Sequence, residues 1–193
     1  MLDAWQLRGA AITRLHGGHI NATFVVRAPD GAPTAVLQRL NPIFAPEVNL
    51  DIQVVCERLA SRGVPSPQLI ATRHGRPWAL DEAGGCWRLM THIAGHTVER
   101  CDGTRRCREA GRMLGRFHAA LWDLEHTFAH RRPGVHDAPR HLRALEDALA
   151  RGAAHRMFAV IQPLGRAILD AARGVGPRRG LPQRGVHGDP KIT

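Results

Sequence analysis

The residues best suited to chemistry lie at the carboxyl end of the sequence, between Gly185 and Thr193. His187 and Asp189 form a His-x-Asp triplet, and Lys191 follows two positions later. A carboxylate placed in this way can take the proton of an attacking hydroxyl group. Such triplets are common, and a surface turn is the alternative interpretation. The triplet therefore needs support from the rest of the chain.

A glycine-rich turn in the amino-terminal half is the second candidate. The segment from Leu15 to Asn21 joins two predicted strands and contains Gly17 and Gly18. Backbone N–H groups of small residues can approach phosphate oxygens closely, so this turn could fold over the phosphates of a nucleotide. It lacks the Gly-x-Gly-x-x-Gly pattern, and an ordinary β-hairpin is the alternative.

A cation and a carboxylate are expected to accompany that turn. The third predicted strand ends at Arg39, which is our candidate for the phosphate-binding cation. A phosphate-binding cation on a strand needs a partner that holds it in place; in kinases that partner is a carboxylate on the helix that follows the strand. We favour Asp51 because it lies well inside that helix, one residue before the inward-facing Ile52. Glu47 and Glu57 remain possible, and exposure to solvent would explain each of the three.

Apolar periodicity predicts strands before helices. Strands are predicted at 11–16, 22–27, 34–39, 68–72 and 86–93. Helices are predicted between Pro46 and Gly63, at about 105–122, from Asp137 onward and around 163–173. We therefore predict an α+β fold with an antiparallel sheet and one helix in residues 1–94, followed by a helical lobe in residues 95–193.

Composition excludes several classes of protein. The 193 residues carry 27 basic and 17 acidic side chains, for a net charge of +10. The arginines are spread from Arg8 to Arg184 without a nucleic-acid-binding motif, so a nucleic-acid partner is not expected. The 12 histidines and four cysteines match no common zinc pattern. Without a signal peptide or an apolar run of about 20 residues, we expect a cytoplasmic protein and no membrane partner.

Several segments together resemble one family. They are residues 17–24, 36–41, 87–90, 109–118, 133–139 and 187–191. In this order they resemble the aminoglycoside phosphotransferase superfamily, whose members are small-molecule kinases with a protein-kinase-like two-lobe fold. Within it they are most similar to N-acetylhexosamine 1-kinase-like bacterial phosphotransferases. The resemblance implies that ATP, Mg²⁺ and a small-molecule acceptor are the partners.

The resemblance also implies roles for individual residues. Asp189 would be the catalytic base, His187 would brace its loop, and Lys191 would reach the transferring phosphate or the acceptor. Near the acceptor pocket would lie His136 and Asp137, although a helix cap is the preferred explanation for Asp137. The expected nucleotide-binding residues are Gly17, Gly18, Asn21, Arg39, Asp51, Met90 and His92, with residues 90–93 as the linker that meets adenine.

One departure from the family concerns the metal. Kinases carry a metal-binding Asn five residues after the catalytic Asp, and that position would fall one residue past Thr193. We therefore expect a carboxyl-terminally truncated kinase with weak or absent activity, whose parent transfers the γ-phosphate of ATP to a sugar or amino sugar. The alternatives are a non-catalytic nucleotide-binding remnant and, less favoured, a basic nucleic-acid-binding protein.

Overall fold

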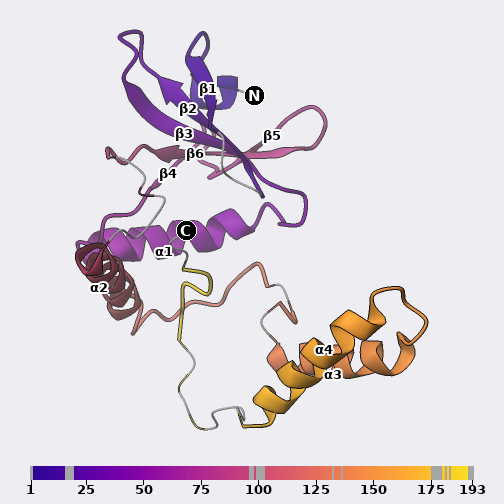
Figure 1. Ribbon diagram of the computed structural model, residues 1–193. Coiled ribbons are helices and arrows are strands. Elements are labelled where there is room, and N and C mark those ends of the chain that lie inside the picture. The colour runs from indigo at the N-terminus through magenta and orange to yellow at the C-terminus, as the bar shows by residue number, and fades with distance from the viewer. Residues whose placement is uncertain are drawn as a thin grey trace. The chain divides into compact units, whose positions relative to one another are not determined.

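The amino-terminal strands pair into one antiparallel sheet in the computed structural model, which describes residues 2–15, 20–95, 98, 103–131, 133–135, 137–174, 180, 182 and 184–190. A short 3₁₀ helix, η1, precedes the sheet at Leu2–Trp5. The strands are β1 (Ala11–Leu15), β2 (Ala22–Arg27), β3 (Pro33–Arg39), β4 (Leu69–Ile70), β5 (Ala79–Leu80) and β6 (Cys86–Thr91). Their spatial order is β1-β2-β3-β6-β4, and β5 also pairs with β6 (Figure 1).

Four helices complete the described elements. They are α1 (Val48–Ser61), α2 (Thr104–Ala120), α3 (Ala138–Arg151) and α4 (Phe158–Arg173). Gly63 follows the end of α1 with φ of +65°, the left-handed conformation that commonly terminates a helix. Helix α4 begins five residues before its predicted start, so Pro163 lies inside it. The predicted α+β class with an amino-terminal antiparallel sheet is confirmed.

The chain packs as two compact units. The first contains Met1–His130 together with Arg184–Thr193, and the second contains Arg131–Gln183 with α3 and α4. The predicted lobe boundary at residue 94 falls inside the first unit, and the two-lobe division remains a prediction. Within the described residues, no helix is both long and apolar enough to cross a membrane.

One face of the sheet is apolar and closed by η1. Leu37 and Leu89 pair directly across β3 and β6, and both are almost completely buried. Trp5 packs on them and donates its indole N–H to the carbonyl oxygen of Ile70 at 2.8 Å. Side chains alternate between the two faces of a strand. The neighbours of these leucines in β3 and β6 must therefore point to the opposite face.

That opposite face meets α1. Cys86 and Arg88 of β6 both contact Asn49, which is completely buried in the first turn of α1. The other side of α1 packs against α2, where Leu59 and Leu121 belong to a second apolar cluster. Helix α1 therefore lies between the sheet and α2 (Figure 1). At this junction Asp123 accepts hydrogen bonds from Arg58 at 2.5 Å and Arg62 at 2.8 Å.

We predict that Leu37→Ala destabilises the sheet strongly. Leu37 is 0% exposed, and truncating a fully buried leucine costs about 2–5 kcal/mol. The matched control is Leu80→Ala on β5, where the side chain is 57% exposed, with an expected change of less than about 0.5 kcal/mol. Urea unfolding followed by tryptophan fluorescence measures both. Equal losses in the two variants would contradict this account of the core.

Candidate active site

Residues 184–190 contain the predicted catalytic base Asp189, and for that prediction we call them the catalytic segment. They pack against the carboxyl-terminal half of α2. The ring of His187 lies edge-on to Phe117 with 5.5 Å between centroids. The backbone N–H of His187 donates to Nε2 of His118 at 3.3 Å. The guanidinium of Arg184 lies 4.8 Å from the ring centroid of Trp122. These contacts fasten the segment that carries Asp189 to a helix about 70 residues earlier in the chain.

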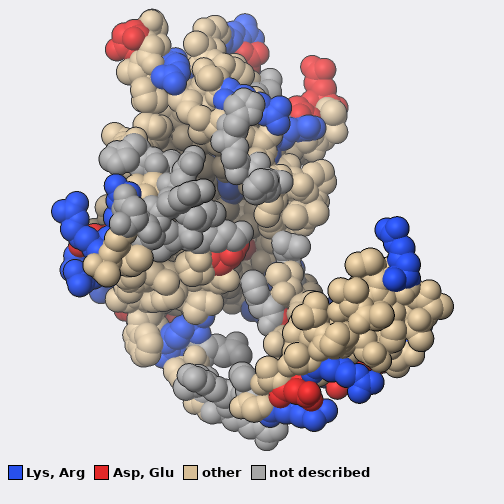
Figure 2. Space-filling view, viewed as in Figure 1, with Lys and Arg blue, Asp and Glu red and all other residues tan. Residues whose placement is uncertain are grey.

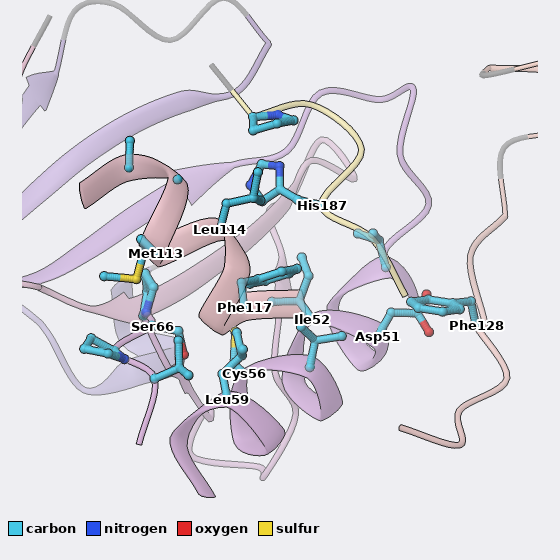
Figure 3. A pocket seen from close by; sticks show the side chains of 18 of the residues that line it. Asp51, Ile52, Cys56, Leu59, Ser66, Met113, Leu114, Phe117, Phe128 and His187 are labelled. Atoms are coloured by element: carbon cyan, nitrogen blue, oxygen red, sulfur yellow. The ribbon is translucent and has the colours of Figure 1, made fainter. Parts of the chain in front are cut away.

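A cavity of about 960 Å³ brings the catalytic segment together with α1 and α2. All of its lining residues belong to the first unit. His187 and Pro190, which flank Asp189, line it from the catalytic segment. Figure 3 shows that the facing wall is mostly apolar: Ile52, Cys56 and Leu59 from α1, and Met113, Leu114 and Phe117 from α2. The fold therefore places the His-x-Asp triplet at a cavity beside α1.

Asp51 fastens a distant loop to α1. Its carboxylate is 4% exposed and accepts the backbone N–H groups of Ala129 at 2.8 Å and His130 at 2.9 Å. Nε2 of His126 lies 2.8 Å from the same carboxylate. Burial by itself would raise the pKa of Asp51, but these three interactions outweigh it and hold the pKa below its ordinary value. Asp51 therefore stabilises the first unit as an ionised group.

Arg39 pairs with a carboxylate other than the one expected. Its Nε lies 3.7 Å from Oδ2 of Asp81, and its guanidinium lies 6.0 Å from the ring of Trp87. Trp87 donates its indole N–H to the same Asp81 oxygen at 2.8 Å. The predicted pairing of Arg39 with Asp51 is therefore wrong. Arg39 is an even number of residues from Leu37, so it lies on the face that η1 covers, away from α1.

Asn21 holds the base of the predicted nucleotide turn. Its Oδ1 accepts the backbone N–H of Asn41 at 2.9 Å, and Asn41 donates through Nδ2 to the carbonyl oxygen of Ile20 at 3.3 Å. These bonds join the start of β2 to the end of β3. Gly17 and Gly18 lie outside the described residues. Their predicted role in nucleotide binding remains a prediction.

The other predicted site residues are dispersed over the fold. Met90 lies in β6, opposite Val36 of β3, and His92 immediately follows the strand; both are half-buried. Their adenine-binding role remains a prediction. Asp137 accepts the backbone N–H of Arg140 at 3.0 Å as the N-cap of α3, in agreement with the preferred cap explanation. Lys191 and His136 lie outside the described residues.

Arg88 is not among the site residues predicted from the sequence. Its Nε and Nη2 donate to Oε1 of Gln38 at 3.0 and 2.7 Å, and its Nη1 lies 3.4 Å from Oδ1 of Asn49. Gln38 in turn donates to Oγ1 of Thr23 at 3.0 Å. This polar chain runs from β6 through β3 to β2 on the face toward α1. The alternation of side chains along β6 could have indicated the position of Arg88. Trp87 and Leu89 belong to the apolar face, so Arg88 between them must point to the opposite face.

The described residues do not form a metal site by themselves. In the parts of the chain that the structure describes, no three His, Cys, Asp or Glu side chains come close enough together to hold a metal ion. The expected Mg²⁺ remains a prediction.

The described chain thus combines a protein-kinase-like α+β fold with a His-x-Asp segment beside the helix that packs on the sheet. The chain belongs to the phosphotransferase enzyme family, whose sequence model matches residues 11–192. This confirms the resemblance to the aminoglycoside phosphotransferases. No curated protein matches the chain significantly in sequence.

Several solved structures are similar to the chain, among them two kinases. One is a microcompartment-associated aminopropanol kinase, with a TM-score of 0.57 and 17% identity over 78% of this chain and 54% of that one. The other is an amicoumacin kinase in complex with AMP-PNP, Ca²⁺ and Ami, with a TM-score of 0.54 and 15% identity over 75% of this chain and 48% of that one. The chain thus spans about half the length of these kinases. At such identities the likeness establishes the fold alone.

We predict that Asp51→Asn lowers the free energy of unfolding by about 1–3 kcal/mol at neutral pH, because an amide replaces a buried charged acceptor. The pKa of Asp51 is lower in the folded chain than its unfolded value of 3.8. Its contribution is therefore complete above that value and is lost as the pH falls through the folded pKa. Denaturant unfolding at pH 7 and below pH 4 measures the difference.

The control for this experiment is Glu57→Gln, a change at an exposed carboxylate on the same helix. It should alter stability by less than about 0.5 kcal/mol at either pH. A pH-independent gap between wild type and Asp51→Asn would mean that the ionised form of Asp51 is not the stabilising group.

Proposed function

We propose that the protein is an ATP-dependent small-molecule kinase whose catalytic base is Asp189. The observation that carries the proposal is the position of the catalytic segment, which is packed on α2 and lines the same cavity as α1. Membership of the phosphotransferase enzyme family supports the reaction class. The aminopropanol kinase and the amicoumacin kinase are each named for a small-molecule acceptor, which supports a small acceptor here.

The proposed reaction moves one phosphoryl group. The acceptor hydroxyl oxygen forms a bond to the γ-phosphorus of ATP while the bond to the oxygen that bridges the β- and γ-phosphates breaks, and ADP leaves with that electron pair. The hydroxyl proton passes to the carboxylate of Asp189. His187 acts on this step indirectly, because its contacts with Phe117 and His118 hold the segment in place.

The proposal includes a divalent cation and a sugar or amino sugar as acceptor. A divalent cation, when bound, would neutralise phosphate charge during transfer. The acceptor class rests on the resemblance to N-acetylhexosamine 1-kinase-like proteins. Binding of nucleic acid receives no support from the surface, because basic and acidic side chains are interspersed on the face shown in Figure 2. The second candidate is nucleotide binding without phosphoryl transfer.

We predict that Mg·ATP at about a hundred times its Kd raises the Tm of the full chain by roughly 5–10 °C, because a ligand that binds only the folded state stabilises it. Transfer of the γ-phosphate from radiolabelled ATP to a panel of hexosamines, N-acetylhexosamines and amino alcohols measures activity. The truncation expected from the sequence would make the wild-type transfer rate low. Relative to that rate, Asp189→Asn should lose about 10²–10⁴-fold, and it should retain the Tm gain.

The matched control is Asp30→Asn, in the turn between β2 and β3, where the carboxylate accepts only a local backbone N–H in the described structure. It should leave both readouts unchanged. Absence of any Tm gain with nucleotide would reject the proposed function. A Tm gain without transfer to any acceptor would instead support the non-catalytic alternative.

A further inference from the structure

Arg88 is a cation in a half-buried position without an acidic partner. Its side chain lies on the sheet face that meets α1, and its hydrogen-bond acceptors are the neutral amides of Gln38 and Asn49. Within the described ranges, no carboxylate comes within ion-pair distance of it. Desolvation lowers the pKa of Arg88, although a guanidinium stays charged throughout the physiological range. Burying an unpaired charge costs desolvation free energy, and an anion that binds beside the guanidinium would offset that cost.

The geometry of Arg88 leaves donors for an anion. A guanidinium has five N–H groups, and three of those on Arg88 have acceptors. One N–H on Nη1 and one on Nη2 lack an acceptor among the residues that the structure describes. Oε1 of Gln38 accepts hydrogen bonds from both Nε and Nη2 of Arg88, and these two bonds fix the orientation of the guanidinium plane. A guanidinium with donors remaining on both terminal nitrogens can bind two oxygens of a phosphate.

The polar chain from Arg88 leads toward the predicted nucleotide turn. Gln38 donates to Thr23, and these two residues are direct partners in the β2–β3 register. Thr23 lies two residues after Asn21, which fastens the base of the turn. Arg39 is on the other face of the sheet, where it is 49% exposed and engaged with Asp81 and Trp87. Arg88 therefore contacts α1 from its own face of the sheet, whereas Arg39 does not share that face.

We propose that Arg88, with Gln38 and Asn49 orienting it, is the residue that binds the phosphates of ATP, in place of Arg39. This inference rests on the proposed kinase function. The phosphate-binding cation is then on β6 and not on β3, and Gln38 is a positioning residue because it orients Arg88. It also assigns a ligand class to the α1 face of the sheet, namely a nucleoside polyphosphate held through its phosphates.

The test compares Arg88→Met with Arg39→Met, which removes the same charge from the opposite face. Isothermal titration of the full chain with ATP and with adenosine separates phosphate binding from base binding. We expect Arg88→Met to weaken ATP binding about ten- to hundredfold, the loss typical of a charged hydrogen-bonding group. Adenosine binding should not change. Arg39→Met should bind both ligands as the wild type does.

The outcomes distinguish this inference from the proposed function. If the wild type binds no ATP, the kinase proposal fails and this inference fails with it. If the wild type binds ATP and Arg88→Met binds it equally well, only the assignment of Arg88 is overturned. An equal loss of ATP and adenosine binding would also overturn it, because a merely structural role for Arg88 would affect both ligands.

Two milder variants decide the question if Arg88→Met does not fold. Arg88→Lys keeps the charge but loses the two-point geometry, and Gln38→Leu removes the acceptor that orients the guanidinium. Each should weaken ATP binding several-fold and leave adenosine binding intact. Wild-type ATP affinity in both variants would overturn the assignment. Circular dichroism and thermal melting confirm that the variants compared are folded.

Discussion

Burial of the leucines in β3 and β6 fixes which charged side chains can reach α1. A fully buried leucine contributes about 1.5–3 kcal/mol, whereas an exposed ion pair such as Arg39–Asp81 contributes at most about 1 kcal/mol. Burial of the apolar side chains therefore determines the register of β3 and β6, and the charged side chains occupy the positions that this register leaves. With Leu37 and Leu89 under η1, Arg39 must share their face and Arg88 must take the opposite one. This alternation determines the chemistry of the α1 side of the sheet.

Helix α1 joins a polar sheet face to an apolar helix interface. Toward the sheet it presents Asn49, a buried amide whose oxygen faces Arg88 and whose nitrogen bonds to its own helix start. Toward α2 it presents Leu59, which belongs to the second apolar cluster. Asp51, on the same helix, binds the 126–130 loop through two backbone N–H groups. One helix thus connects the sheet, α2 and the loop that follows α2.

The catalytic segment is held by contacts that are distant in sequence. His187 packs on Phe117 in the carboxyl-terminal half of α2, and Arg184 packs on Trp122 in the turn after α2, so both support the segment that carries Asp189. Aromatic contacts of this kind contribute about 0.5–1.5 kcal/mol each beyond their burial. They are sufficient to position a short segment that has no helix or strand of its own.

The sequence by itself determined the α+β class, the order of the four helices and of five of the strands, the glycine after α1, the cap at Asp137 and the family, because these depend on local patterns and on motif order. It did not predict η1 or β5. It did not determine which carboxylate pairs with Arg39 or that Arg88 faces α1. Those facts depend on strand register and on contacts such as that of Asp51 with His130, 79 residues later. Only the tertiary structure decides them, because an ion pair forms between side chains that the packing of the apolar core brings together.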